Sequence, residues 1–244
     1  WLGGCGGIKN DEWEYMSTTH NDRNDVENDD NAKLACNYTT YIIDSILEDN
    51  VNNKQWFQGR LYNHYVGTHD FYSDRKNVEI EFLHIKNNEN YSIWYATSLS
   101  NKDLALTEAV AVNRIKNIPD AGNKSFNGTV GFGGFKHQPN VTFASVDFKE
   151  KTVKIDAKFE GFATSVNFGR ERFTVNSSDM KFHGESGRFE GEVVATHYDV
   201  AGRLQSYTGR VSGWLGGDGG TQIALLYKLP WGHNSIDFFI GYAE

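Results

Sequence analysis

The chain has 244 residues, a formal net charge of −8 and a mean hydropathy of −0.57. Residues 1–125 hold 12 Lys and Arg against 19 Asp and Glu, whereas residues 126–244 hold 12 against 13. An acidic chain without a basic cluster is not a nucleic-acid-binding protein, because phosphate contacts need concentrated positive charge. No apolar run approaches the roughly 20 residues of a membrane-spanning helix. We expect two domains, 1–124 and 125–244, and no membrane span.

The two cysteines, Cys5 and Cys36, both lie in the first domain. A pair without CxxC or His/Cys spacing is poor material for a zinc site, so we expect a Cys5–Cys36 disulfide. Two free thiols in a cytosolic protein are the alternative. Residues 2–5 (LGGC) have the form of a lipoprotein cleavage box, but four residues precede the cysteine and no hydrophobic leader is present. We therefore expect secretion, with an outer-membrane surface lipoprotein as the alternative.

The first predicted element is a helix over residues 39–50, where four aliphatic residues recur at helical spacing. Residues 55–72 contain six aromatics among glycines and histidines without a clean period, which predicts a loop with short strands. Residues 78–85 alternate apolar and acidic, and residues 91–97 follow an Asn-rich turn. These two segments predict a hairpin, whereas residues 104–118 fit a helix or a strand. The first domain is therefore predicted to be α+β.

From Ser125 onward the hydrophobic period is two, with turns rich in Gly, Asn and Asp. Eight strands are predicted, near 126–133, 140–148, 151–159, 169–182, 187–199, 204–213, 220–228 and 236–242. Short, evenly spaced antiparallel strands favour a closed up-and-down barrel, which removes exposed sheet edges. The chain is thus predicted to be mainly β, with an eight-stranded antiparallel barrel after the α+β domain.

Short motifs in the second half occur in a recognisable order. They are residues 126–130 (FNGTV), 146–148 (VDF), 151–153 (KTV), 189–192 (FEGE), 209–216 (GRVSGWLG) and 238–241 (FFIG). In this order they resemble the C-terminal barrel of transferrin-binding protein B, factor H binding protein and other cargo of the Slam translocators. The resemblance implies that the barrel is a scaffold and export signal, and that a variable N-terminal handle binds the ligand.

Among members of this size, the layout is most similar to the hemophilins, secreted haemophores that hold haem b in the handle. The resemblance implies haem as ligand, a TonB-dependent outer-membrane receptor and a Slam translocator as partners. Haem needs an aromatic slot, cations for its propionates and an imidazole for its iron. The predicted slot residues are Trp56, Phe57, Tyr62, Tyr65, Phe71, Tyr72, Phe82, Trp94 and Tyr95. The predicted propionate partners are Arg60, Arg75 and Lys76.

Three histidines are candidate iron ligands. His84 lies on the apolar face of its predicted strand, where a buried imidazole needs either a metal or a hydrogen-bond partner. A core histidine bonded to backbone fits that position equally well. His64 and His69 lie in the aromatic segment and are either ligands or solvated loop residues. The sequence does not decide between one axial histidine and two. His137, His183, His197 and His233 have no ligand spacing, which indicates surface or hydrogen-bonded residues.

Three other functional classes compete with a haemophore. A host-protein binder, like the relatives that capture transferrin or factor H, would use the same aromatics and arginines as an interaction surface. A lipocalin-like carrier would hold a small molecule inside the barrel, but eight strands leave a narrow interior. An enzyme is not expected, because the sequence has no nucleophile elbow, phosphate loop or zinc-protease helix.

Overall fold

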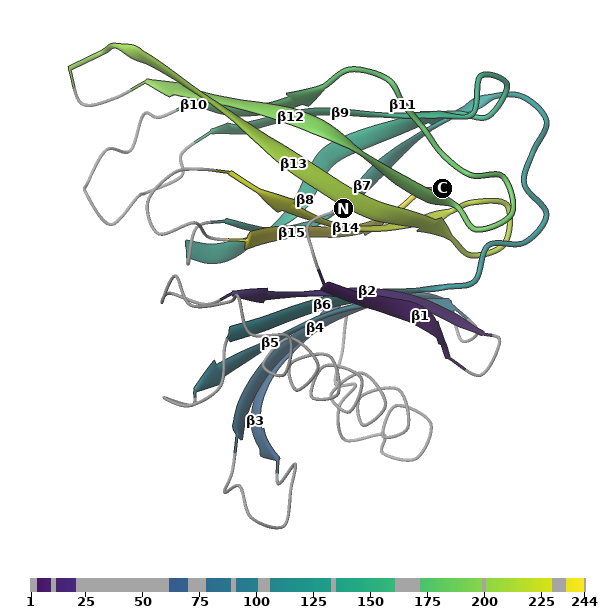
Figure 1. Ribbon diagram of the computed structural model, residues 1–244, viewed down its shortest axis with the longest axis horizontal. Coiled ribbons are helices and arrows are strands. Elements are labelled where there is room, and N and C mark those ends of the chain that lie inside the picture. Colours follow the sequence, from purple (N-terminus) through teal and green to yellow (C-terminus); the bar gives the residue numbers. More distant parts are fainter. Residues whose placement is uncertain are drawn as a thin grey trace. The chain divides into compact units, whose positions relative to one another are not determined.

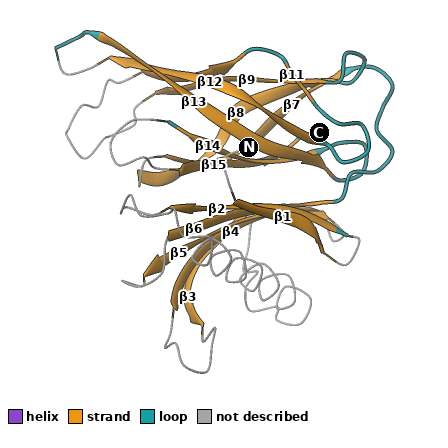
Figure 2. Cartoon of the chain, in the orientation of Figure 1, coloured by secondary structure: helices purple, strands orange, loops and turns teal. Residues whose placement is uncertain are grey.

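The structure is a computed structural model, and the part that it describes consists of strands and their connecting loops (Figure 2). The described residues are 4–9, 12–20, 62–69, 78–88, 91–100, 106–132, 135–160, 172–198, 201–229 and 236–243. The predicted helix at 39–50 and Cys36 lie outside them, so the helix and the disulfide stay predictions. Chain contacts divide the protein into two compact units, Gly3–Arg114 and Ile115–Glu244.

The first unit contains one six-stranded antiparallel sheet, with strand order β1-β2-β6-β5-β4-β3 (Figure 1). The strands are β1 (Gly4–Lys9), β2 (Trp13–His20), β3 (Tyr62–His69), β4 (Val78–Asn88), β5 (Tyr91–Ser100) and β6 (Leu106–Asn113). The predicted hairpin is confirmed as β4 and β5. The ambiguous segment 104–118 contains a strand, β6, because its alternating Val and Ala residues fit between β2 and β5.

The centre of this sheet is buried on both faces. Val110, Ala111 and Val112 are successive residues of β6, and none is exposed to solvent. Tyr15 and Met16, their partners on β2, are also buried. Because successive side chains of a strand point to opposite faces, both faces of β2 and β6 are shielded from water. A strand of this kind reads as a continuous apolar run, which explains why its sequence also fitted a helix.

The second unit is a closed eight-stranded antiparallel barrel with one short additional strand. Its strands are β7 (Asn123–Phe132), β8 (Phe135–Asp147), β9 (Thr152–Glu160), β10 (Arg172–Ser177), β11 (Met180–Lys181), β12 (Arg188–Tyr198), β13 (Leu204–Gly216), β14 (Gln222–Lys228) and β15 (Ile236–Tyr242). The eight long strands pair in chain order, and β15 pairs back onto β7. The predicted up-and-down barrel is confirmed.

Large apolar side chains fill the described part of the barrel interior. Phe143 stacks on Phe239 with ring centroids 4.5 Å apart, and Tyr227 lies against Phe143 at 5.8 Å. The Tyr227 hydroxyl donates to the Gly131 carbonyl at 3.2 Å, so the one phenol in this ring cluster is satisfied. These side chains are buried together with the branched aliphatics around them. In the described part of the barrel, this filled interior argues against the lipocalin-like carrier.

The segment 169–182, predicted as one strand, is divided into β10 and β11. The division follows from Ser177, whose hydroxyl accepts the backbone N–H of Ile155 at 2.8 Å and donates to the Ser178 carbonyl at 2.8 Å. A serine side chain thus replaces a ladder partner, as serine often does at strand ends and turns. Pairing resumes at Met180, opposite Val153.

Residues 115–124, expected in the first domain, pack with the barrel. Ile115 is buried in the barrel core. Lys116 forms a parallel bridge with Asp218, its backbone N–H donates to the Gly217 carbonyl at 3.1 Å, and its carbonyl accepts from Gly219 at 2.7 Å. Because these bonds belong to the barrel, this part of the second unit begins at Ile115, before the first barrel strand β7.

Candidate functional site

The sheet of the first unit carries eight of the residues predicted to hold haem. In an antiparallel sheet, residues directly opposite each other share a face, and neighbouring rows alternate between the two faces. One row contains positions 84 and 94, which are paired across β4 and β5. The row two residues away contains positions 65 and 82, paired across β3 and β4. His84, Trp94, Phe82 and Tyr65 therefore occupy positions on one face of the sheet.

His64 belongs to the other face. It pairs with Leu83, and Leu83 pairs with Tyr95. Tyr62 lies two residues before His64 on the same strand and hence on the same face. The register therefore separates His64, Tyr62 and Tyr95 from the set around His84. Two iron ligands must meet at one metal ion, so His64 and His84 do not form a pair on this sheet.

His69 shares the face of His84 by strand period but lies at the far end of β3. It pairs with Val78, whereas His84 pairs with Asn63. Six residues along a strand at about 3.4 Å each separate the two backbone positions by roughly 20 Å. An axial pair needs imidazoles on opposite sides of one iron, which this spacing does not provide. The strand register thus groups His84 with Trp94, Phe82 and Tyr65 on one face, and His64 with Tyr62 and Tyr95 on the other.

The other predicted site residues lie outside the described part of the chain. These are Trp56, Phe57, Arg60, Phe71, Tyr72, Arg75 and Lys76.

Within the residues that the structure describes, no group of three or more His, Cys, Asp or Glu could hold a metal ion. Cys5 lies in β1 opposite Ser17. Nor does the described part contain a helix long and apolar enough to cross a membrane.

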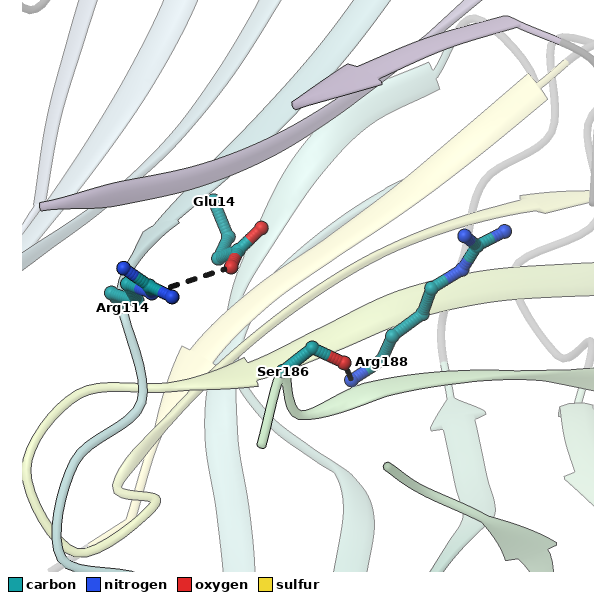
Figure 3. A network of polar contacts seen from close by, with 4 residues as sticks. All are labelled: Glu14, Arg114, Ser186 and Arg188. Atoms are coloured by element: carbon teal, nitrogen blue, oxygen red, sulfur yellow. Dashed lines mark hydrogen bonds and ion pairs between the residues drawn. The ribbon is translucent and has the colours of Figure 1, made fainter. Parts of the chain in front are cut away.

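A buried carboxylate lies at the end of the first unit (Figure 3). Glu14 is 3% exposed, and its Oε1 lies 3.8 Å from Nε of Arg114, whose side chain is partly exposed. Burial raises the pKa of Glu14, and the positive charge of Arg114 partly opposes this shift. The backbone N–H of Arg114 also donates to the Glu12 carbonyl at 2.8 Å. These contacts fix the last residue of the unit to β2, which is a structural role.

A stack of three rings spans three strands on the inner face of the barrel. The imidazole of His197 lies parallel to Tyr207 at 5.5 Å and to Phe173 at 6.0 Å. Phe173 and His197 are directly opposite in register. His197 is therefore a packed ring of the barrel. Its neighbour Tyr198 points to the opposite, outer face because it is the next residue of the strand.

The outer face of the same strands carries the two large hydrophobic residues that are exposed among the described side chains. Tyr198 is 49% exposed and Leu204 is 60% exposed, and the two are directly opposite each other on β12 and β13. The next two rows on this face hold Thr174, Thr196 and Ser206, then Asn176, Val194 and Thr208. We call these eight residues the Tyr198 face.

Sequence reasoning did not identify the Tyr198 face. In the sequence, Tyr198 and Leu204 continue the alternation of strands whose other apolar residues belong to the core. The register shows that they belong to the outward-facing set, with an exposed Thr208 and Ser206 on the same side. A signal was present, because the buried positions of β12 are odd-numbered, whereas the apolar residue Tyr198 is even-numbered.

The comparisons with known proteins concern the fold. No protein-family model matches the chain, and no curated protein matches it. Among solved structures, the vaccine antigen transferrin-binding protein B of Haemophilus parasuis Hp5, as a mutant, matches with 15% identity and a TM-score of 0.47 over 77% of this chain and 38% of its own. The intact Ap transferrin-binding protein B, with N and C lobes, matches with 15% identity and a TM-score of 0.47, over 77% of this chain and 39% of its own.

The isotype 1 transferrin-binding protein B of serogroup B Neisseria meningitidis matches with 12% identity and a TM-score of 0.41, over 77% of this chain and 36% of its own. The chain therefore spans about two fifths of the length of these proteins.

Proposed function

We propose that this chain is a surface-exposed binding protein that captures a host protein, of the transferrin- or factor H-binding kind, and that it is not an enzyme. The observation that carries the proposal is the pairing of exposed Tyr198 with exposed Leu204 on the outer face of the barrel, whose other large apolar side chains are buried or partly buried among the described residues. Tyrosine is enriched at the energetic centres of protein interfaces. A directly opposed Tyr and Leu give a contiguous apolar contact that a partner protein would cover.

A cell-surface location follows from this proposal, because a host protein is accessible only outside the cell. A surface lipoprotein fits this requirement directly, and a secreted protein fits it when a receptor retrieves the complex. A TonB-dependent receptor and a Slam translocator would be the partners of such a protein in the outer membrane. These partners belong to the proposal and rest on the resemblance of the barrel motifs.

Binding to purified host proteins tests the proposal. The chain is immobilised, and transferrin and factor H are passed over it separately, with serum albumin as the control protein. We expect saturable binding to transferrin or to factor H and none to albumin. The matching solved structures are named for transferrin binding, which makes transferrin the first probe. The absence of saturable binding to either host protein would remove the proposed function.

Haem capture is the second candidate, and it rests on a different observation. His84, Trp94, Phe82 and Tyr65 occupy two adjacent same-face rows of the first sheet, an arrangement that fits a porphyrin with one axial histidine. When bound, haem would supply iron for delivery to a receptor. These positions favour a single ligand because His64 lies on the other face.

Titration with haemin distinguishes this candidate from the first. A haem-binding chain gives a sharp Soret band at one equivalent, and His84→Ala should abolish the band. The matched variant His64→Ala changes a histidine on the neighbouring strand and opposite face, and it should leave the band intact. A broad, unsaturable spectrum with the unmodified chain would eliminate haem as the ligand.

A further inference from the structure

We infer that the Tyr198 face is the surface that contacts the captured protein, and that this partner presents an apolar centre bordered by acidic groups. The inference rests on the proposed function, to which it adds the location of the contact and the charge of the partner. It assigns the contact to the barrel, which the resemblance describes as a scaffold.

The eight residues of the Tyr198 face carry no formal charge. Tyr198 and Leu204 form the outermost row. The hydroxyls of Thr174 and Thr196 are hydrogen-bonded to each other in the second row. Tyr, Ser, Thr and Asn dominate this face, and such side chains combine apolar contact with adaptable hydrogen bonding at little conformational cost. An uncharged outer face of this composition is suited to contact with another protein.

Charged residues border the face and give it a sign opposite to that of the whole chain. Lys158 and Asp156 end its second and third rows on β9, and Glu192, Arg210 and Lys228 form the row that follows the third. Arg203 immediately precedes Leu204. All six are exposed. Among the residues whose exposure the structure describes, the border thus has four basic and two acidic residues, whereas the chain has 24 Lys and Arg against 32 Asp and Glu.

A locally basic border selects among partners by long-range attraction. Opposite charges around an interface accelerate encounter, and their effect decreases with salt, whereas apolar residues at the centre control dissociation. A partner with carboxylates around an apolar depression would match both parts of the face. A basic partner would be attracted by the chain as a whole but repelled at this border.

Two sets of full-length variants test the inference, with transferrin and factor H as probes. Tyr198→Ser with Leu204→Ser removes the apolar pair, and Glu185→Ser, an exposed residue in the turn before β12, is the matched control. Lys158→Glu reverses a basic border residue. Asp156→Lys, two residues earlier on the same face of β9, is its matched opposite. Circular dichroism and thermal unfolding verify that each variant keeps the fold.

We expect the double serine variant to lose affinity by about tenfold or more, mainly through faster dissociation, and the control to keep it. Lys158→Glu should slow association severalfold and Asp156→Lys should accelerate it, and 0.5 M NaCl should remove both effects. Two results would overturn this inference alone. One is binding by the unmodified chain that the double serine substitution does not weaken. The other is a reversal of the two charge effects, with association faster for Lys158→Glu and slower for Asp156→Lys. No binding by the unmodified chain would overturn the proposed function and this inference together.

Discussion

Ile155 donates its backbone N–H to the hydroxyl of Ser177 at 2.8 Å, a bond that takes the place of a strand-to-strand pairing in the barrel wall. Removing the hydroxyl in Ser177→Ala would leave a partly buried N–H without its acceptor. We expect a loss of about 1–3 kcal/mol in the free energy of unfolding, measured by urea denaturation. Ser178→Ala changes an exposed neighbour whose carbonyl stays in place, and it should be nearly neutral. Equal effects of the two variants would contradict this account.

Ile115 anchors the segment before the first barrel strand, so its truncation should destabilise the barrel. The side chain is 8% exposed and belongs to the core, whereas Ile118 is only partly buried against it. We expect Ile115→Ala to cost about 2–4 kcal/mol of unfolding free energy, because it loses buried area and leaves a cavity. Ile118→Ala should cost clearly less. A smaller loss at position 115 than at 118 would place the start of the barrel later in the chain.

The left-handed backbone at Gly187 predicts two separable costs of adding a methyl group. Gly187 has φ +73°, and a Cβ there would lie 2.1 Å from the Leu215 carbonyl oxygen. Gly202 has φ +75° with no atom near the added Cβ. Gly202→Ala should therefore cost only the conformational strain, about 1–2 kcal/mol. Gly187→Ala should cost several kcal/mol more in chemical denaturation, and equal costs would show that the steric term is absent.

Glu14 predicts a pH dependence of stability with a definite sign. Burial raises its pKa in the folded state above the ordinary value of 4.5, with Arg114 opposing the shift. The folded state then binds the proton more tightly than the unfolded state does. The carboxyl consequently contributes stability that is fully present below pH 4.5 and is lost as the pH rises through the folded-state pKa.

Glu14→Gln isolates this contribution. The unmodified chain should gain stability relative to the glutamine variant as the pH falls from 7 toward 4, as measured by the midpoint of thermal unfolding at each pH. Glu12→Gln, at an exposed position two residues away, is the control and should show no such trend. A gain in the opposite direction would mean that the ion pair with Arg114 outweighs burial.

Much of the barrel could be predicted from sequence because its strands alternate strictly and are separated by turns with recognisable residues. Val153, Ile155 and Ala157 face inward, whereas Lys154 and Asp156 between them are exposed. Such alternation is a local property, so the period itself predicts the strand. The segment around Ser177 departed from prediction because a side-chain hydrogen bond ended the strand, and a period of two does not encode that competition.

The candidate site was harder to predict because register is a long-range property. A shift of one residue moves every side chain of a strand to the other face, so sequence could not show that His64 and His84 lie on different faces. Similarly, Tyr198 and Leu204 resemble core residues in composition, and the register of their strands shows that they face outward together. Function depends on these pairings more than on the residue types.

The seam between β7 and β15 has a consequence for how the protein folds. It joins Val130 to Phe239, at opposite ends of the barrel segment, whereas every other pairing among the eight long strands joins one long strand to the next along the chain. Closing so long a loop costs conformational entropy before the contacts between β7 and β15 can compensate for it. We therefore expect this seam to form last and to limit the folding rate. Until then both strands would expose unpaired edges, and the interval before closure is when the chain is most vulnerable to aggregation.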